Sequence, residues 1–510
     1  MSASSARLKP INGVSTTTTG FVGPCRFGPL QPQLVTGLRD FEDIYGDGQE
    51  LVYRSEKPGV NYLWQSARAF FEQGGQRLYI ARIFNGANTA VAGLGTAIQI
   101  RARHPGSGGN GIVRFTLSCN PCAEVPEISV STVLQLSKWS RQVWTGLSPE
   151  SALNNFADNS STPILISGAL NGSVFLDALF HLKPELKSNL VKTNSTDDER
   201  SVDIHLSGGS DGARPRATDY AGVAADEGRS TGLLAFETIK NISIVAAPGC
   251  TENFARNSVD ATATIQNLIS HAEQMRYRFA ILDSGDQQTV PDVRSLRAKL
   301  NSSYAALYYP WIRILDPVSN TGINLPPSGF VAGIFVRKDM TGSISQPPAN
   351  EVLALATGFE QAITQEQQEI LSSEGINCFR TFPGRGNLLW GARTISSDPE
   401  WKYVNLRRYV AYLEQSIEEG THWVVFEPNN ETLWANVRQT VTDFLYKEWT
   451  AGRMVGTRAE EAFFVKCDRT TMTQNDIDNG RLVCVIGVAL TKPAEFVIFR
   501  IGQWTADRKA

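Results

Sequence analysis

The order of apolar runs in the middle of the chain restricts the possible folds more than any other feature. ISIVAAPG is a short apolar run that ends in a turn, SVDATATIQNLISHAEQMRYR has helical spacing, and RFAILD is a second apolar run. Strands that are apolar throughout must be covered on both faces, and strands that alternate with helices are typical of parallel sheets. The sequence therefore predicts an α/β (α+β mixed) fold with a mainly parallel sheet.

The length of the chain indicates several domains, and its composition indicates a soluble globular protein. A chain of 510 residues is too long for one ordinary hydrophobic core, so we expect two or three domains. The net charge of -3 gives no bulk attraction to nucleic acid or to anionic membranes. No run approaches the ~18 apolar residues of a membrane helix. We therefore expect neither nucleic acid nor a membrane as a partner.

The N-terminus and the cysteines indicate synthesis in a reducing compartment. MSASSARLKPINGVSTTTTGF lacks the apolar segment of a secretory signal. An odd, scattered set of cysteines in a long chain without a signal suggests reduced thiols in the cytosol. The set consists of Cys25, Cys119, Cys122, Cys250, Cys378, Cys467 and Cys484.

The amino-acid composition changes along the chain. Residues 87–235 are rich in Asn, Ser, Thr and Gly, which is typical of an insertion with long surface loops. Later, WKYVNLRRYVAYLEQSIEEG predicts a helix that ends at Gly420, and ETLWANVRQTVTDFLYKEW predicts another. The second helix places Leu433, Val437, Val441 and Phe444 on one face. The carboxylates of the first, Glu414, Glu418 and Glu419, are interpreted as a solvated face.

The last apolar run, EFVIFRIG, is apolar on both of its faces. Phe496 and Ile498 point one way, whereas Val497, Phe499 and Ile501 point the other. A strand of this kind needs cover on both sides and hydrogen-bonding partners along its edges. We expect it to complete either a sheet of its own subunit or a sheet of a neighbour.

Three motifs resemble binding sites but lack the context that those sites need. GSGGNG at 106–111 fits GxGxxG, yet the following IVRFTLSC alternates like a strand, so a turn between strands is favoured. Cys119 and Cys122 form a CxxC without a second pair at zinc-ligand spacing, which favours two incidental thiols over a redox role. GRGNLLWG lacks the order of a phosphate-binding loop. We therefore expect no metal and no cofactor.

GGSDG at 208–212 leaves one catalytic alternative open. It fits GxSxG with Ser210 as the nucleophile of a serine hydrolase, and VDIHL before it is strand-like. His271 and His422 remain as possible bases. The helix that must start at the serine would meet Gly212 and Pro215, and an interior proline costs a helix about 3 kcal/mol. The sequence context therefore disfavours a serine hydrolase.

Read in order, the segments resemble the contractile tail sheath family of myovirus tails, R-type pyocins and phage-tail-like contractile injection systems. FVGPCRFGPLQPQLVTGLRDFEDIYG and AFFEQGGQRLYIARI are similar to the opening blocks of the family. The resemblance is densest after Pro326, in PPSGFVAGIFVRKD, QPPANE, GINCFRTFPGRGNLLWGARTIS, YVNLRRYVAYLEQSIEEGTHWVVFEPNNETLW and PAEFVIFRIGQ. No single motif is diagnostic, but their order along nearly the whole chain is specific.

The resemblance implies a structural protein and not an enzyme. Subunits of the family polymerise as stacked rings, commonly six-fold, around an inner tube, and contract to drive the tube through a target envelope. Its implied partners are itself, the tube protein, and the baseplate and terminator or cap proteins. It would be made in the bacterial cytoplasm and become part of a virion tail or an injection-system particle.

The resemblance also implies a multidomain layout with a discontinuous core, an inserted outer domain and a strand-donating C-terminal arm. The expected parts are an arm (1–20), a core in two parts (21–86 and 236–348), a variable outer domain (87–235), a C-terminal core domain (349–490) and a second arm (491–510).

The resemblance assigns two sets of site residues. Residues expected to be donated as a strand to a neighbouring subunit are Phe496, Val497, Ile498, Phe499, Arg500 and Ile501. Residues expected in a structural loop of the conserved core are Pro383, Gly384, Arg385, Gly386, Trp390, Gly391 and Arg393.

The N-terminus departs from the family pattern. Family members begin with a PGVY.EE-like strand, whereas this chain has ARLKPINGVSTTTTG, which is shorter and lacks that apolar alternation. Donation of an N-terminal strand therefore stays open. So does the choice between a main sheath subunit and a specialised terminal ring near the baseplate or cap.

Overall fold

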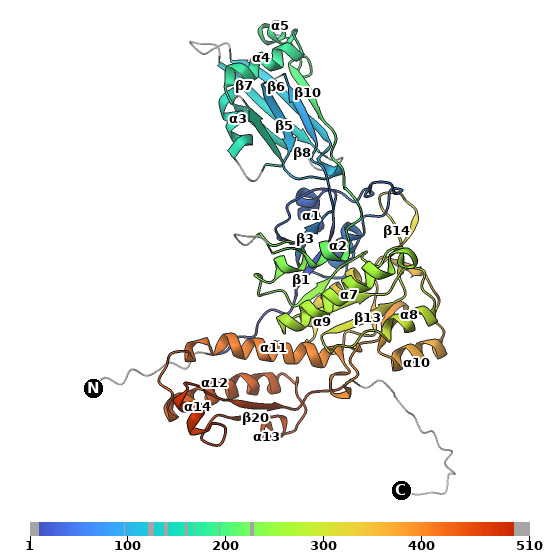
Figure 1. Cartoon of the computed structure of the whole chain (residues 1–510), viewed down its shortest axis with the longest axis vertical. Coiled ribbons are helices and arrows are strands. Elements are labelled where there is room, and N and C mark those ends of the chain that lie inside the picture. Colours follow the sequence, from blue (N-terminus) through green and yellow to red (C-terminus); the bar gives the residue numbers. More distant parts are fainter. Residues whose placement is uncertain are drawn as a thin grey trace, which may run out of the picture. The chain divides into compact units, whose positions relative to one another are not determined.

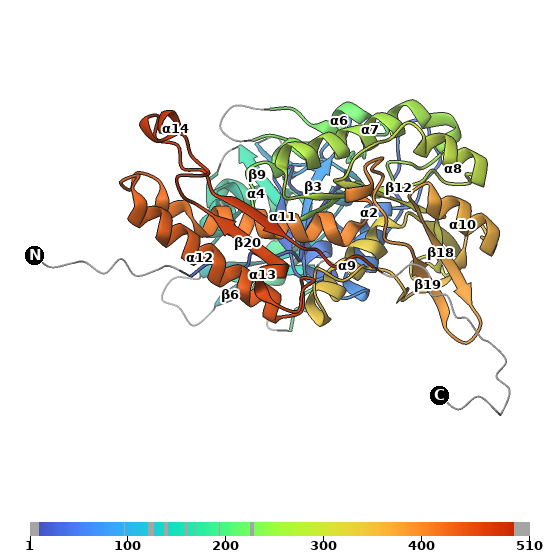
Figure 2. The ribbon, with the colours of Figure 1, turned by 90° about the horizontal axis from the view of Figure 1, so that it is seen from below.

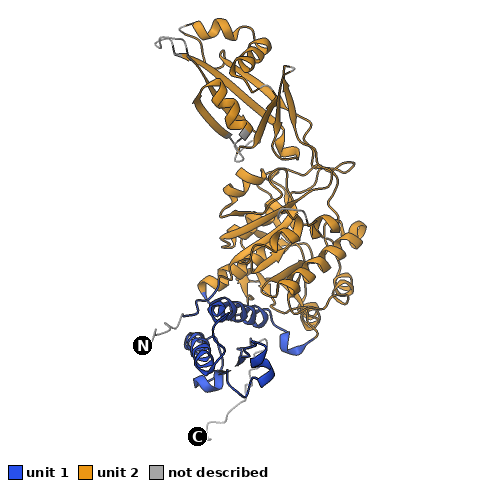
Figure 3. Ribbon diagram, turned by 60° about the vertical axis from the view of Figure 1, so that its left-hand side comes forward, with its two compact units in different colours: residues 1–14, 342–347, 398–510 blue, residues 15–341, 348–397 orange. Residues whose placement is uncertain are grey.

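A computed structural model describes residues 10–95, 97–120, 127–136, 141–158, 162–168, 170–192, 194–224 and 229–493. The chain divides into two compact units (Figure 3). The small unit consists of the described residues within Met1–Val14, Gly342–Pro347 and Asp398–Ala510. The large unit consists of those within Ser15–Thr341 and Pro348–Ser397.

The centre of the large unit is a nine-stranded sheet. In sheet order its strands are β16 (Glu351–Val352), β19 (Gly386–Trp390), β18 (Ile376–Phe382), β13 (Ala305–Tyr309), β12 (Phe279–Asp283), β11 (Ile244–Ala246), β1 (Thr18–Pro24), β3 (Arg77–Ile83) and β2 (Gln33–Val35). The pairings from β18 across to β3 are all parallel, and those at both edges are antiparallel. The predicted α/β fold with a mainly parallel sheet is confirmed.

Helices cover both faces of this sheet, because its central strands are apolar on both faces. Every residue of β12 and of β13 is buried. α7 (Phe254–Met275), α8 (Val290–Arg297) and α10 (Gln365–Ser373) share a core with one face. α2 (Tyr62–Glu72) and α9 (Ser328–Thr341) cover the other, where Phe21 meets Phe70 at 5.8 Å between ring centroids. Figure 2 shows α7 and α8 on the opposite side of the sheet from α9.

Two glycines let α9 approach α2 closely. A Cβ at Gly329 would lie 2.6 Å from the Ser66 carbonyl oxygen, and one at Gly333 would lie 2.6 Å from that of Phe70. Real Cβ atoms do not come this close to backbone, so any other residue would separate the helices. The close packing of α9 on α2 therefore depends on these two glycines.

Residues 91–206 form a second, antiparallel body within the large unit, with its own hydrophobic core. One sheet has the order β10 (Ser201–Leu206), β6 (Gly111–Asn120), β7 (Glu127–Gln135), β8 (Arg141–Leu147), and the other has β4 (Val91–Leu94), β5 (Ile98–Ala102), β9 (Ile164–Gly168). Its helices are α3 (Pro149–Asp158), α4 (Gly172–Leu182) and α5 (Leu186–Val191) (Figure 1). The expectation of long surface loops is wrong for most of this region, because apolar side chains alternate along its strands.

The remaining described α-helices and strands complete the two units. In the large unit these are α1 (Leu38–Tyr45), α6 (Ala217–Ala221) and a three-stranded sheet of β15 (Gly322–Leu325), β14 (Ile312–Leu315) and β17 (Ala356–Phe359). In the small unit they are α11 (Val404–Gly420), α12 (Glu431–Thr450), α13 (Ala459–Ala462), β20 (Phe463–Lys466), α14 (Gln474–Asp478) and β21 (Val485–Val488). Among the described residues, no helix combines the length and apolarity needed to cross a membrane.

Candidate assembly interface

The small unit is built on the two long helices that the sequence predicts. α11 ends at Gly420, as expected. α12 starts after Asn430, whose side-chain oxygen accepts the Leu433 N–H at 3.0 Å and so caps the helix. The predicted apolar face is confirmed as buried: Leu433, Val437, Val441 and Phe444. Glu414, Glu418 and Glu419 are exposed, as expected.

A buried carboxylate holds the two helices together. Tyr409 and Tyr412 of α11 each donate a hydrogen bond of 3.1 Å to Glu448 of α12. Arg453, just after α12, donates to both oxygens of the same carboxylate at 2.8 and 2.9 Å. Burial, together with the charge of Glu448, raises the pKa of Tyr412 to about 12. Glu448 is only 6% exposed, so these donors replace the water that its charge has lost.

On this scaffold lies a two-stranded antiparallel ribbon, β20–β21. Its inward face packs into the core of the small unit and consists of Phe463, Val465, Ile486 and Val488. Its outward face consists of Phe464, Lys466, Val485 and Gly487, which follow from the alternation of the strands. Phe464 is 49% exposed and Val485 42%. The ribbon therefore presents apolar side chains on the face that its own core does not cover.

The edges of the ribbon are also largely without partners. Within the described residues the sheet has two strands. Next to β21, the Ala489 N–H donates to the Ala462 carbonyl at 2.7 Å, and the Val455 N–H donates to the Ala489 carbonyl at 2.9 Å. A two-stranded ribbon is marginal by itself, and its unpaired N–H and C=O groups are a template for an added strand. The ribbon therefore has the features of an interface for strand addition.

The N-terminal segment before β1 lies on the same unit. Ile11 is 4% exposed and belongs to the core of the small unit. The Val14 N–H donates to the Ser416 hydroxyl at 3.1 Å, and a Cβ at Gly13 would collide with the Tyr412 hydroxyl. Residues 10–14 are thus packed in their own subunit. The segment assigned to the N-terminal arm overlaps β1 at Thr18–Gly20.

The residues expected to be donated, Phe496 to Ile501, lie outside the described residues, which end at 493. Their role stays a prediction. The described chain ends five residues after β21 (488 to 493), so the expected strand follows the ribbon directly in the sequence.

The loop predicted in the conserved core is the tip of a hairpin between β18 and β19. Gly384 and Gly386 have φ of 73° and 80°, which glycine adopts freely, and the Arg385 N–H closes the turn on the Phe382 carbonyl at 3.1 Å. The Arg385 guanidinium lies 5.8 Å from the ring centres of both Phe382 and Trp390. The loop thus forms a closed turn.

The end of this motif is fixed by Asn377 of β18. Its side-chain oxygen accepts the Arg393 N–H at 2.7 Å, and its amide donates to the Arg393 carbonyl at 2.8 Å. A Cβ at Gly391 would lie 2.8 Å from that same oxygen, so the close approach needs glycine. The Arg393 guanidinium donates to the Ser372 carbonyl at 2.6 Å. These contacts are structural, and they anchor the segment that follows β19.

Comparisons with known proteins match the same part of the chain. The model of the phage tail sheath protein central domain matches residues 224–395, and that of the phage tail sheath C-terminal domain matches residues 396–503. The two matches are contiguous and together cover more than half of the chain. The chain belongs to the phage tail sheath family.

Relatives and solved structures of sheath proteins agree with this assignment. A prophage major tail sheath protein of Pseudomonas aeruginosa (strain UCBPP-PA14) is 23% identical over 57% of this chain and 75% of its own length. The tail sheath protein of Escherichia phage P2 is 21% identical over 42% of this chain and 54% of its own length.

Two sheath structures share the fold over almost the whole chain. The helical sheath of the anti-feeding prophage in its contracted state gives a TM-score of 0.58 at 20% identity, and covers 99% of this chain and 98% of that one. The PVC sheath complex of an extracellular contractile injection system, also contracted, gives 0.57 at 18% identity, with 98% and 95% covered.

The phage tail sheath family is structural, and neither alternative left open by the sequence finds support in these comparisons. The structure also argues against a hydrolase. β10 ends before GGSDG as the elbow requires, but no helix starts at Ser210, which instead forms a backbone bridge with Asn88. His271 accepts a hydrogen bond from Arg278 at 2.6 Å. The next helix, α6, begins only at Ala217.

GGSDG and GSGGNG are joined to each other by hydrogen bonds and have a structural role. The buried Asp211 accepts the Ser107 N–H at 2.7 Å, the Ser107 hydroxyl at 2.8 Å and the Val52 N–H at 2.9 Å. GSGGNG joins two strands, β5 and β6, as the sequence predicts. Cys119 is half-buried near the end of β6, whereas Cys122 lies outside the described residues. Among the described residues no group of three metal-ligating side chains comes together.

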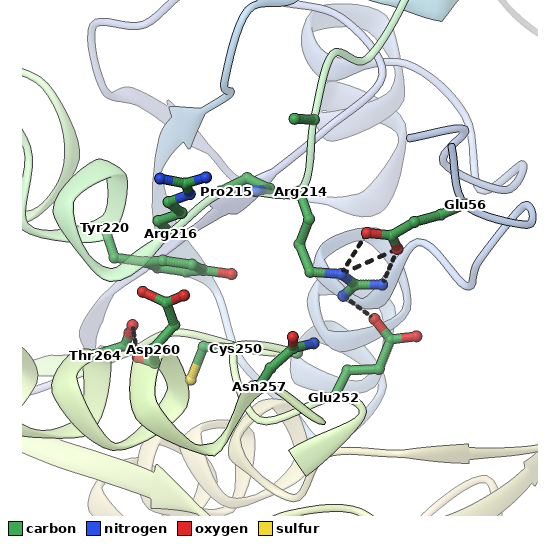
Figure 4. A pocket seen from close by; sticks show the side chains of 12 residues that line it. Glu56, Arg214, Pro215, Arg216, Tyr220, Cys250, Glu252, Asn257, Asp260 and Thr264 are labelled. Atoms are coloured by element: carbon green, nitrogen blue, oxygen red, sulfur yellow. Dashed lines mark hydrogen bonds and ion pairs between the residues drawn. The ribbon is translucent and has the colours of Figure 1, made fainter. Parts of the chain in front are cut away.

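A polar cavity of about 250 Å³ lies where the chain returns from the antiparallel body to the parallel sheet (Figure 4). At its wall Arg214 donates to Glu56 at 2.8 Å and also pairs with Glu252, while its guanidinium lies 5.1 Å from the Tyr53 ring centre. Burial raises the pKa of the Glu252 carboxyl above its ordinary value, although Arg214 opposes that shift. The cluster fastens the returning segment to the core.

Sequence reasoning missed the ribbon edges, Glu448 and Asp211. The short apolar runs FFVK and VIGV are a detectable signal of strands at Phe464 and Val485, but the sequence does not show that one face stays uncovered. Glu448 sits at an apolar-face position of α12, and that exception in the helical pattern is the signal that could have identified it.

Proposed function

We propose that this chain is the structural subunit of a contractile sheath that polymerises as stacked, six-fold rings around an inner tube. On contraction the sheath drives the tube through a target envelope. The observation that carries the proposal is the contiguous family match over residues 224–503, on a fold shared with contracted sheaths over nearly the whole chain. The partners are further copies of the chain, the tube protein, and the baseplate and terminator or cap proteins. Assembly takes place in the bacterial cytoplasm.

The energy for contraction comes from subunit interfaces that repack between two discrete arrangements. Such a mechanism needs a connection that persists while the subunits move. The ribbon β20–β21 supplies a docking place for it, because its edges are largely unpaired and Phe464 and Val485 are half-exposed. The segment Phe496 to Ile501 supplies the strand, because it is apolar on both faces. We infer that this strand pairs with the ribbon of a neighbouring subunit.

Negative-stain electron microscopy of the purified protein, alone and mixed with the tube protein encoded beside it, tests the function. Hollow striated tubes are the expected result. Dispersed monomers under both conditions would contradict the proposal.

Deletion of residues 495–510 tests the strand separately. The expected result is a monomer that unfolds at the same temperature as the full chain but forms no tubes, because the deleted strand stabilises only the neighbour. A matched control is Val191→Glu, which adds a charge at an 85% exposed position of α5 and should leave assembly intact. Normal tubes from the truncated chain would refute strand donation and leave the sheath function standing.

A further inference from the structure

Two cysteines face each other across the open end of the ribbon. The last paired residues of the ladder are Lys466 of β20 and Val485 of β21. Cys467 and Cys484 are the next residues on either side, so they are opposite each other in the same register. The two side chains lie close enough for each thiol to shift the pKa of the other. Both are free thiols in this structure.

The register places this pair at a position suited to a direct bond between the sulfurs. The Ala489 N–H donates to the Ala462 carbonyl at 2.7 Å, so the pair 462 and 489 is of the hydrogen-bonded type. Hydrogen-bonded and non-hydrogen-bonded pairs alternate along an antiparallel ladder. Counting along the ladder makes Cys467 and Cys484 a non-hydrogen-bonded pair, whose Cα atoms lie about 4.5 Å apart. Disulfides span Cα separations of about 4.4–6.8 Å.

The two thiols differ in access and in acidity. Cys467 is fully buried, whereas Cys484 is half-buried. The hydrogen bond from the Cys467 thiol lowers the pKa of Cys484, and the positive charge of Arg438 acts in the same direction. The same hydrogen bond raises the pKa of Cys467. Cys484 is therefore the thiol that reacts first, with Cys467 placed behind it as the resolving thiol.

We propose that Cys467 and Cys484 form a disulfide that closes the ribbon when the protein meets a low-molecular-weight disulfide. The Cys484 thiolate attacks one sulfur of that disulfide, which forms a mixed disulfide and releases one small thiol. Cys467 then gives up its proton and attacks the Cys484 sulfur, which releases the second small thiol. The two cysteines are oxidised, the small disulfide is reduced to two thiols, and the two cysteine protons end on those thiols.

The bond would fix the ribbon from its open end. It would close the loop of residues 468–483, which holds α14 and is already tied by the hydrogen bond of 2.8 Å from the Thr471 hydroxyl to the Val483 carbonyl. Closing such a loop reduces the entropy of the unfolded chain. The ribbon is reduced in the cytosol and becomes cross-linked outside it, so the device acts after the protein leaves the cell.

Oxidation of the purified full-length chain with glutathione disulfide, followed by alkylation and peptide mass spectrometry, tests the proposal. The expected product is a peptide pair joined at Cys467 and Cys484, with a mass lower by two hydrogens than the reduced pair. The midpoint of thermal unfolding should rise by about 5 °C and return after dithiothreitol. Absence of the joined pair, or glutathione that stays on Cys484 in the unmodified chain, would overturn the proposal.

Two variants separate the roles of the thiols. Cys467→Ser should trap glutathione on Cys484, because no resolving thiol remains. Cys484→Ser should leave Cys467 unmodified, because it is buried. Cys250 is the matched control in the same sample: it is half-buried, but burial raises its thiol pKa well above the ordinary value, so it should react least. Equal glutathione labelling of Cys250 and Cys484 would remove the basis for the proposed order.

Discussion

The nine-stranded sheet and the ribbon β20–β21 differ in how much of each sheet the chain itself completes. The large sheet has helices on both faces, and its edge strands β2 and β16 are only three and two residues long. Short edge strands offer little for another chain to pair with. The ribbon has one covered face, largely open edges and half-exposed apolar side chains. The large sheet is therefore complete within the subunit, whereas the ribbon keeps the open edges that the proposed strand addition requires.

The largest expected effect on stability comes from a substitution that creates a cavity against one face of the large sheet. Phe70 is fully buried against Phe21, so Phe70→Ala should lower the free energy of unfolding by about 3–5 kcal/mol. The measurement is urea unfolding of the isolated subunit. The matched control is Phe426→Ala, at a fully exposed side chain of the small unit, which should change the value by no more than about 0.5 kcal/mol. Similar losses from both variants would contradict the picture of a self-sufficient large unit.

A pH-dependent effect of up to about 4 kcal/mol is expected at Asp283, at the end of β12. Burial raises its carboxyl pKa to about 7, although the Ser328 N–H and hydroxyl, both at 2.7 Å, oppose the shift. Between about pH 4 and 7 the native state then holds a proton that the unfolded state has lost, so stability falls as pH rises through this window. Asp283→Asn keeps the shape of the side chain and should remove this dependence of folding stability on pH. Unfolding free energies of both proteins at about pH 5 and about pH 8 measure it.

Asp292 is the control for this prediction, because its carboxyl pKa is shifted in the opposite direction to that of Asp283. Asp292 at the start of α8 is exposed, and hydrogen bonds from Thr289 lower its carboxyl pKa. Its contribution is present at neutral pH and is lost as pH falls through the acidic range. Asp292→Asn should therefore remove the loss of folding stability that Asp292 causes at low pH. An unchanged pH profile for Asp283→Asn would show that Asp283 stays ionised in the folded sheet.

In the small unit, the carboxylate that joins the helices should be worth about 2–3 kcal/mol. Glu448→Gln removes the charge that Arg453, Tyr409 and Tyr412 surround, and urea unfolding measures the loss. Glu431→Gln is the matched control on the same helix, because that side chain is 80% exposed and its contact with Arg469 is 4.0 Å long. Equal effects of the two substitutions would show that α11 and α12 are held together by their apolar faces alone.

The sequence predicts the features that depend on neighbouring residues, but it does not predict contacts between residues that are far apart in the chain. The parallel sheet is predictable because strands such as RFAILD are apolar throughout and alternate with helices, and the ends of α11 and α12 follow from Gly420 and from the helical spacing. Residues 87–235 are rich in Asn, Ser, Thr and Gly, and this composition predicts an insertion with long surface loops, because the short strands of the antiparallel body alternate only locally. Long-range polar contacts are not predictable in this way: Tyr409 and Glu448 are 39 residues apart.

In the candidate assembly interface, too, the local features are predictable from the sequence and the long-range features are not. The hairpin at Pro383 to Trp390 is predictable from its glycines and the apolar runs beside them, and the resemblance to sheath proteins identified it as structural. The open edges of the ribbon are a property of what the rest of the chain fails to cover. Only the folded chain shows that β20 and β21 stop at two strands within the described residues.

The smallest effect on the subunit, and the sharpest test of the comparison, is expected from Phe464→Glu. Phe464 lies on the outward face, 49% exposed. Its ring covers Gly487, where a Cβ would lie 2.2 Å from it, and the Lys466 ammonium lies 5.7 Å from its centre. The charge should lower the free energy of unfolding by at most about 0.5–1 kcal/mol, since it faces solvent in the isolated chain. In the assembly the same position would be covered, and burying an unpaired carboxylate costs several kcal/mol per subunit. Tube formation with the tube protein, followed by electron microscopy, should therefore be lost while the urea midpoint hardly moves. If the midpoint falls as far as in Phe70→Ala, the ribbon belongs to the core of its own subunit, and the division of roles between the two sheets is wrong.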